Sequence, residues 1–409
     1  MNVFETLTPI AAHRLNASVL KPYAQCYLDH LSARGYARLT IRQYLNCASH
    51  FAYWANRQQI SLPSIKQHVN HFVTWHLPRC RCKPFAQRQR HATKAALNHL
   101  MVVMANTGIT LDTDEMSAVD LQLQNFEQYL QQVKGLARTT SHQRVAIIRP
   151  LALQSPQDAL PTPDQLRRFL REKFARISAA SAGVTAAAVR SYLNFHAFKG
   201  NRIEHLLPIV GSPANWRLAA NPQVLSTSEV SLLLRAFPEE MPSRLRSYAM
   251  VRCLIDLGLR SSEVISLELK DIDWTNGIIH ICKSKSRRVD TLPLPSQTVF
   301  ALADYIKSER PQTLSRRIFV RHVAPFDKPI AAGVVRRVVR EAYQRAGLAH
   351  TKVHILRHTL ASRLLEKGGT LKDVADILRH RALDTSMIYA KIDVVKLSAV
   401  AMSWPGSQP

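Results

Sequence analysis

Polar and cationic side chains gather at four places between residues 258 and 389, each at an expected helix end or turn. In the first, Gly258-Leu-Arg260-Ser-Ser-Glu263, Arg260 lies between a glycine that ends one helix and serines expected to cap the next. The second, Lys283-Ser-Lys285-Ser-Arg287-Arg288, is a turn of four cations that can enter a groove or touch phosphates. Each cluster by itself is more often a solvated surface than a site.

The third and fourth clusters add histidines and a tyrosine. His354 and Arg357 are three residues apart and share one face of an expected helix. His380 falls at the end of a later helix, and Asp384 or Thr385 can cap a further helix that carries Tyr389 in its second turn. A lone tyrosine in such a position is usually part of a core.

Taken together, these residue types suit attack on a phosphodiester. Negative charge develops on the non-bridging oxygens, and an arginine fork donates two hydrogen bonds to a phosphate while staying charged. A tyrosine hydroxyl, with an ordinary pKa of about 10, becomes a nucleophile when cations and a base favour its ionisation. The chain has no Gly-Lys pair and therefore no P-loop for a nucleotide.

The order and spacing Arg…Lys…His-x-x-Arg…His-x8-Tyr resembles the signature of the tyrosine recombinases, the phage integrase family. The matching stretches, between about residues 220 and 400, are LGLRSSEVISL, KSKSRR followed by TLPLP, VHILRHTLASRLLEKG and LRHRALDTSMIY. The resemblance implies DNA cleavage and rejoining through a 3′-phosphotyrosine and a free 5′-hydroxyl, with no cofactor. It assigns the catalytic roles to Arg260, Lys285, His354, Arg357, His380 and Tyr389.

In these roles, Arg260 and Arg357 would clamp the scissile phosphate, with His380 as a further hydrogen-bond donor. Tyr389 would attack phosphorus, and His354 would orient or deprotonate the tyrosine. A hairpin lysine protonates the leaving group. Counting back from Leu292-Pro293-Leu294 favours Lys285, with Lys283 as the alternative.

The same resemblance predicts where the chain meets DNA. The family's usual Leu-Gly-His is Leu-Arg-His here, so Arg379 adds a cation where glycine is common. Contacts to the DNA backbone are expected from Arg38, Arg42, Arg79, Arg81, Arg138, Lys283, Arg287, Arg288 and Arg379.

The elements that must position these residues are mostly helices. Alternating patterns predict three short strands over residues 272–274, 278–281 and 289–294, the first two joined at Asn276-Gly277. The remaining periodic segments are helical. The predicted fold class is mainly α with a small antiparallel sheet, in which helical DNA-clamping domains precede a tyrosine-recombinase catalytic domain with the DNA breaking-rejoining fold.

An internal duplication supports two clamping domains. Gly35-Tyr-Ala-Arg-Leu-Thr40 reappears as Gly135-Leu-Ala-Arg-Thr-Thr140, and each copy passes a glycine and restarts at a threonine that can cap the next helix. A Pro-rich stretch near residues 208–223 marks a boundary. We expect a helical SAM-like DNA-binding domain over residues 1–112, a core-binding domain over 113–218 and the catalytic domain over 219–409.

Composition favours a nucleic-acid partner. The 55 Lys and Arg outnumber the 29 Asp and Glu and give a formal net charge of +26, so we expect the surface to bind a polyanion. Six cysteines in 409 residues do not form a secreted disulfide framework. With no signal peptide and no long apolar run, we expect a cytoplasmic, nucleoid-associated protein.

A zinc site is the alternative for one basic stretch. His76, Cys80, Cys82 and His91 offer ligand types, but Cys-x-Cys lacks the two-residue gap of common zinc knuckles. The stretch PRCRCKPFAQRQRH is interpreted more simply as a DNA-contacting segment, so no metal is predicted.

The function predicted is a site-specific recombinase or integrase that acts on double-stranded DNA at a specific target site, in integration, excision or transposition. A type IB topoisomerase and a non-catalytic DNA-binding protein are the rivals. Family resemblance implies a four-protomer synapse, with or without partner recombinases, joined through the apolar segment 392–402 after Tyr389. The double clamp resembles integrases of transposon-like elements.

Overall fold

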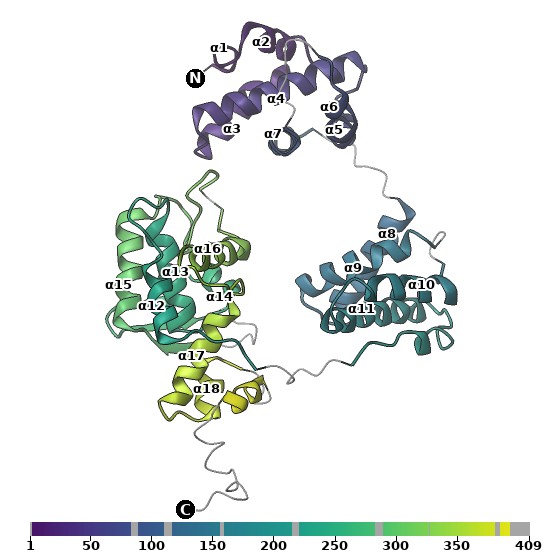
Figure 1. The fold of residues 1–409 in the computed structure, drawn as a ribbon. Coiled ribbons are helices and arrows are strands. Elements are labelled where there is room, and N and C mark those ends of the chain that lie inside the picture. The colour runs from purple at the N-terminus through teal and green to yellow at the C-terminus, as the bar shows by residue number, and fades with distance from the viewer. Residues whose placement is uncertain are drawn as a thin grey trace, which may run out of the picture. The chain divides into compact units, whose positions relative to one another are not determined.

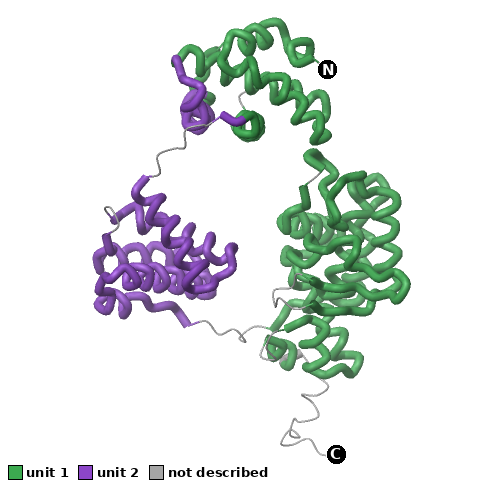
Figure 2. Tube along the Cα trace, turned by 180° about the vertical axis from the view of Figure 1, so that it is seen from behind, with its two compact units in different colours: residues 1–58, 77–107, 218–409 green, residues 59–76, 108–217 purple. Residues whose placement is uncertain are grey.

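A computed structural model describes residues 2–82, 89–109, 117–155, 159–214, 221–282, 289–326, 328–380 and 385–392. The chain forms two compact units (Figures 1 and 2). The first comprises residues 1–58, 77–107 and 218–409, and the second comprises residues 59–76 and 108–217. Among the described residues, none of the helices is both long and apolar enough to cross a membrane.

The N-terminal part of the first unit is built around α4 (Arg38–Arg57), which packs against α2, α3 and α7. Its inward face buries Ile41, Leu45 and Phe51. The other elements of this part are α1 (Val3–Thr6), α2 (Pro9–Asn16), η1 (Lys21–Tyr23), α3 (Ala24–Ala33), α6 (Leu77–Arg79) and α7 (Arg90–Asn106).

In the second unit, α11 (Ala179–Phe198) packs against α9 and α10 over a core that includes Phe126, Tyr192 and Leu193. Thr162 and Gln165 form a capping box that starts α10. Its other elements are α5 (Ile65–His71), the π-helical turn η2 (Phe72–His76), α8 (Ala118–Gln128), the π-helical turn η3 (Tyr129–Val133), α9 (Arg138–Ala152), α10 (Pro163–Phe174) and η4 (Leu207–Ile209).

The helices of the two sequence copies begin at equivalent positions, but the threonines do not cap them as predicted. The residues that precede α4 and α9 are Ala37 and Ala137, so Thr40 and Thr140 lie inside the first turns and the expected threonine caps are wrong. In each copy an alanine two residues after the glycine has extended backbone and is the N-cap residue of the helix. Arg38 and Arg138 therefore occupy equivalent first helical positions, and both are exposed.

The C-terminal part of the first unit has a helical core beside a small sheet. Buried residues of α13, among them Met250 and Leu254, pack against α15, α16 and α17. Its helices are α12 (Thr227–Arg235), α13 (Arg244–Asp256), α14 (Ser261–Ser266), η5 (Leu269–Asp271), α15 (Ser296–Asp304), the π-helical turn η6 (Tyr305–Glu309), α16 (Ala332–Arg345), α17 (His354–Glu366), α18 (Leu371–Ile377) and the 3-10 helix η8 (Met387–Ile392).

The sheet is antiparallel in the order β1-β2-β3, with β1 at Ile272–Asp273, β2 at Ile278–Ile281 and β3 at Asp290–Pro293. Ile272 pairs with Ile279, which in turn pairs with Leu292. The Asp273 carboxylate accepts hydrogen bonds from the backbone of Thr275 and Asn276 and so stabilises the β1–β2 turn. The mainly helical fold with a small antiparallel sheet is confirmed.

Candidate active site

The first predicted cluster is shaped by a close approach at Gly258. This glycine has φ +58°, and a Cβ there would lie 2.7 Å from Leu378 Cδ2 and 3.0 Å from Leu360 Cδ2. A larger residue would therefore push α13 away from α17 and the chain after α18. Arg260 is itself the N-cap residue of α14, so the expectation that a serine caps this helix is wrong.

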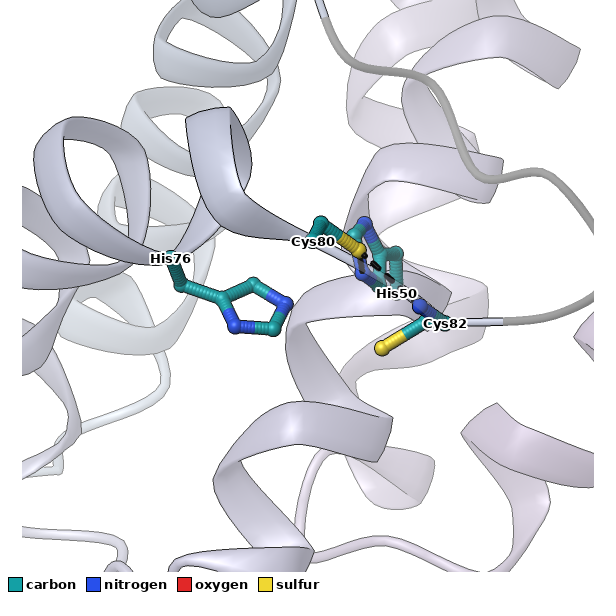
Figure 3. Close-up of side chains that lie close together, drawn as sticks. All are labelled: His50, His76, Cys80 and Cys82. Atoms are coloured by element: carbon teal, nitrogen blue, oxygen red, sulfur yellow. Dashed lines mark hydrogen bonds between the residues drawn. The ribbon is translucent and has the colours of Figure 1, made fainter.

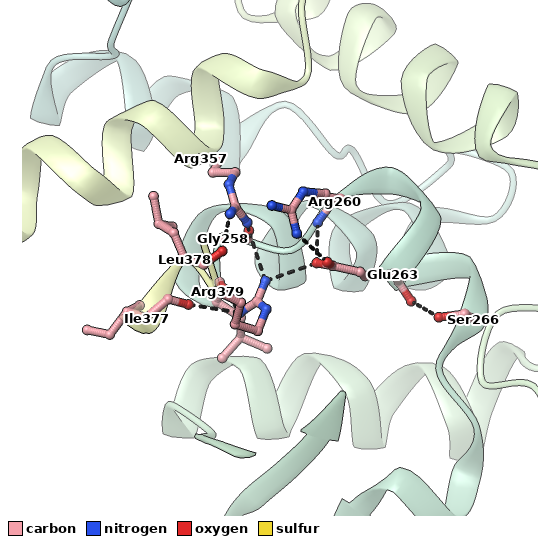
Figure 4. Close-up of polar contacts among 9 residues, drawn as sticks. Gly258, Arg260, Glu263, Ser266, Arg357, Ile377, Leu378 and Arg379 are labelled. Atoms are coloured by element: carbon pink, nitrogen blue, oxygen red, sulfur yellow. Dashed lines mark hydrogen bonds and ion pairs between the residues drawn. The ribbon is translucent and has the colours of Figure 1, made fainter. Parts of the chain in front are cut away.

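Glu263, in the first turn of α14, is the shared hydrogen-bond acceptor of the cluster (Figure 4). Its carboxylate accepts hydrogen bonds from the Arg260 backbone N–H at 2.8 Å and from Arg260 Nη1 at 2.7 Å, and it accepts one from Arg379 Nη2 at 2.9 Å. Burial would raise the pKa of Glu263, but the charges of Arg379 and Arg260 and these hydrogen bonds outweigh it and hold the pKa below its ordinary value. One buried carboxylate thus fixes two arginines.

Arg357, in the first turn of α17, is buried and donates to two backbone carbonyls, those of Gly258 and Leu378. The two acceptor carbonyls lie about 120 residues apart in the chain, so Arg357 links three parts of the fold. Burial and the nearby charges of Arg260 and Arg379 lower the pKa of Arg357 to about 9, which still leaves it charged at neutral pH.

The tyrosine lies in the same site. Tyr389 is in the first turn of the 3-10 helix η8, not in the second turn of an α-helix as expected, and the predicted cap Asp384 lies outside the described residues. Its ring packs in a small core with Ala361, Val374 and Leu378. The Tyr389 hydroxyl lies 2.8 Å from His358 Nδ1.

His380 completes this group. Its ring is parallel to that of Tyr389, with centroids 6.4 Å apart, and its Nδ1 lies 2.6 Å from the Ser386 hydroxyl. Burial and the charges of Arg357, Arg260 and Arg379 lower the pKa of His380 to about 4. Burial also raises the pKa of Tyr389, and Arg357 and Arg260 only partly oppose it. The hydroxyl is therefore protonated at neutral pH.

His354 is the first residue of α17 and is exposed at the surface. Neighbouring atoms still desolvate its imidazole, which together with the charges of Arg357 and Arg260 lowers its pKa. Among the described residues, the imidazole bonded to the Tyr389 hydroxyl is that of His358, one helical turn further along α17.

The structure thus brings together five of the six predicted catalytic residues. Lys285, and with it Lys283, Arg287 and Arg288, lies outside the described residues. Of the predicted DNA contacts, five arginines are exposed: Arg38, Arg42, Arg79, Arg81 and Arg138. Arg379 differs, because it is 6% exposed and bonded to Glu263 and to the carbonyl of Ile377. This burial does not favour the predicted DNA contact.

Two residues of the site were missed from the sequence. Glu263 follows Arg260 by three residues, the spacing of a capping box, and that pattern could have singled it out. His358 follows His354 by four residues and so shares its helix face, but the His-x-x-Arg motif does not include it.

Chemically, the site is suited to an anion. Arg260, Arg357 and Arg379 outnumber the single carboxylate of Glu263, and the His380 imidazole and the Tyr389 hydroxyl beside them are uncharged. A phosphate bound there would raise the pKa values of the histidines, and the arginines would stabilise the negative charge that develops on its oxygens during attack. The arrangement can bind a phosphodiester and present a hydroxyl to it.

Comparison with known proteins identifies relatives of this chain. Residues 223–395 match the phage integrase family. A relative from Sinorhizobium fredii, named as an integrase/recombinase, is 32% identical over 94% of this chain and 93% of its own length. The tyrosine recombinase XerD of Mycobacterium tuberculosis is 30% identical over 72% of this chain and 99% of its own length.

A solved structure shares the fold at lower identity. The Tn1549 transposon integrase, in complex with circular intermediate DNA, superimposes with a TM-score of 0.50 and is 16% identical, covering 68% of this chain and 99% of that chain.

Proposed function

The chain belongs to the phage integrase family of tyrosine recombinases, and from this premise we propose that Tyr389 attacks a DNA phosphodiester to form a 3′-phosphotyrosine. The protein is a site-specific DNA recombinase, a tyrosine-type DNA strand transferase. The observation that carries the proposed role is the Tyr389 hydroxyl held by His358 beside His380. Covalent trapping of the protein on a nicked DNA site tests it.

Arg260 and Arg357 would bind the non-bridging oxygens of the scissile phosphate. Glu263 fixes Arg260 through both its backbone and its side chain, so the guanidinium is oriented before DNA arrives. His380 would donate a further hydrogen bond, with Ser386 orienting its ring. Since the bond energy is kept in the phosphotyrosine, a 5′-hydroxyl from another strand can reverse the reaction without ATP.

His358 is proposed to accept the proton of Tyr389. Burial, with the neighbouring His354 and Arg357, lowers the pKa of His358 to about 4, so its imidazole is neutral at pH 7 and its Nδ1 can accept from the hydroxyl. His354 was the residue expected in this role from the sequence, and it would instead contact the phosphate at the exposed start of α17.

We expect His358→Ala to slow single-turnover cleavage by about 10²–10⁴-fold, the usual contribution of a general base. The matched control is His354→Ala, one turn earlier on the same helix, which should retain a faster rate of tyrosine attack. Quenched-flow measurement of the covalent adduct distinguishes them. A greater loss in His354→Ala than in His358→Ala would return the role to His354.

Lys285 is proposed as the acid that protonates the leaving 5′-oxygen. Lys285→Ala should cleave ordinary DNA poorly but cleave a substrate with a 5′-bridging sulfur at a nearly normal rate, because a thiolate leaves without a proton. The control is Lys283→Ala, which should cleave both substrates. If sulfur rescues Lys283→Ala and leaves Lys285→Ala inactive, the acid is Lys283.

DNA binding is proposed to involve both N-terminal copies. Arg38 and Arg138 stand at equivalent, exposed helix starts, and the net charge of +26 supports contact with phosphates. The Tn1549 integrase in complex with DNA supports the same kind of partner and a role in transposition. We propose three domains, over residues 1–112, 113–218 and 219–409.

Assembly and location complete the proposal. Four protomers would form the synapse, with or without partner recombinases, through the segment 392–402, most of which lies outside the described residues. The proposed location is the cytoplasm, at the nucleoid, where the DNA substrate would be.

A further inference from the structure

Four side chains that the recombination chemistry does not use lie together in the N-terminal part of the chain. They are His50, His76, Cys80 and Cys82, and one ligand atom from each lies within 4.8 Å of the others (Figure 3). Within the cluster, Cys80 Sγ and His50 Nε2 are 3.3 Å apart. His50 is 1% exposed and Cys80 is 5% exposed, so the cluster is closed to solvent on one side.

The chain brings them together through two continuous stretches. His50 lies in α4, and the other three follow each other along the helical run from Phe72 to Arg79 and the residues directly after it. His76 and Cys80 are four residues apart, which places them on one side of this run. The run ends at Arg79, so the chain can turn Cys82 back toward Cys80, and the Cys82 backbone N–H donates to Cys80 Sγ at 3.4 Å.

The imidazole of His76 is held in place by its own helix. Its ring stacks on that of Phe72 with centroids 5.1 Å apart. Two of the four ligand side chains, His50 and His76, are therefore set by helical geometry rather than by a loop.

The donor set and its size match one ion. Two thiolates and two imidazoles are a common ligand set of structural zinc sites. Tetrahedral bonds of about 2.3 Å to sulfur and 2.0–2.1 Å to nitrogen place ligand atoms about 3.3–3.8 Å apart, so these atoms need to move inward by about 1 Å at most. Two thiolates neutralise the charge of Zn²⁺. The occupied site would therefore have no net charge, which lowers the cost of its partial burial.

We propose that His50, Cys80, Cys82 and His76 bind one structural zinc ion. The ion links α4 to the segment that carries the exposed Arg79 and Arg81, and it thereby fixes two proposed DNA contacts. The sequence argued against a metal because Cys-x-Cys and His91 have poor spacing. The ligand that completes the set is His50, thirty residues before Cys80.

The test uses the full-length protein without an affinity tag, purified from cells supplied with zinc. Atomic emission should find about one zinc per chain. After exchange with Co²⁺, a thiolate-to-cobalt charge-transfer band and strong visible bands should report tetrahedral coordination. His50→Ala and Cys80→Ser should lose both signals, whereas the control variants His91→Ala and Cys26→Ser should keep them.

Because Cys80→Ser could fail to fold, a second measurement uses the wild-type protein. A chelator should lower its thermal midpoint and should leave the midpoint of a folded His50→Ala variant unchanged. Zinc-free wild-type protein that gives no charge-transfer band with Co²⁺ would overturn the proposal. Binding that disappears in His91→Ala and persists in His50→Ala would show that the ligand set is wrong. Neither result depends on strand transfer, so both are independent of the proposed recombination mechanism.

Discussion

Tyr389→Phe is expected to abolish the covalent adduct with DNA completely, because phenylalanine has no oxygen to bond to phosphorus. The ring is buried among Ala361, Val374 and Leu378, and phenylalanine keeps that packing. The change removes the hydrogen bond between the hydroxyl and His358, and a bond of this kind contributes about 0.5–1.5 kcal/mol to stability. Folding and DNA affinity should therefore survive.

The measurement is a nicked suicide substrate that traps the cleaved intermediate, followed by denaturing electrophoresis. Tyr343→Phe is the matched control, since Tyr343 is a buried tyrosine in the core of the same unit, and it should form the adduct as the wild-type protein does. A gel-shift assay on the uncut site confirms that both variants bind DNA. An adduct of full yield from the Tyr389→Phe protein would remove Tyr389 from the mechanism.

Glu263→Gln is expected to destabilise the first unit by about 3–5 kcal/mol at pH 7, because Arg379 is then left with an unneutralised charge in the interior. The side chains of Glu263 and Arg379 are 1% and 2% exposed. The same change frees the Arg260 guanidinium from the carboxylate that orients it, so cleavage should fall even where the variant is folded.

The dependence of this loss on pH follows from the pKa. The pKa of Glu263 in the folded protein lies below its ordinary value, so its contribution to stability is present above a pH of about 4.3 and is lost as the pH falls through the folded value. Urea unfolding of wild type and variant should therefore differ at pH 7 and converge at acid pH.

Glu240→Gln, the same change at an exposed position of the same unit, should alter stability by less than about 0.5 kcal/mol. An equal unfolding free energy for Glu263→Gln and wild type at pH 7 would show that the buried carboxylate is dispensable. In that case Arg379 would have to be stabilised by the backbone carbonyls alone.

Arg379 shows what a local sequence pattern leaves open. Its place before His380 is a departure from the family's glycine, and a cation on a helix end suggested DNA. In the structure Arg379 adopts φ +54°, a conformation that suits glycine, and turns its side chain inward to Glu263. A local pattern gives the identity of a side chain, but its direction depends on a partner more than a hundred residues away.

The fold class and most element positions could be predicted from local patterns in the sequence, and the family's motif predicted the chemistry. The motif positions Arg260, His354, Arg357, His380 and Tyr389 could be found because their order along the chain is specific, and the strands at 272–281 could be found because alternation and a turn signal are local. Periodicity and caps act within a few residues, so a single sequence reveals them.

The contacts between side chains could be seen only in the folded chain. It placed His358 rather than His354 against the Tyr389 hydroxyl, it made Glu263 the shared partner of two arginines, and it added His50 to the cysteine pair. Each of these contacts joins segments distant in sequence or depends on the rotation of a helix against its neighbours. Such contacts are selected by packing and by the need to pair buried charge, and neither is encoded in the spacing of one segment.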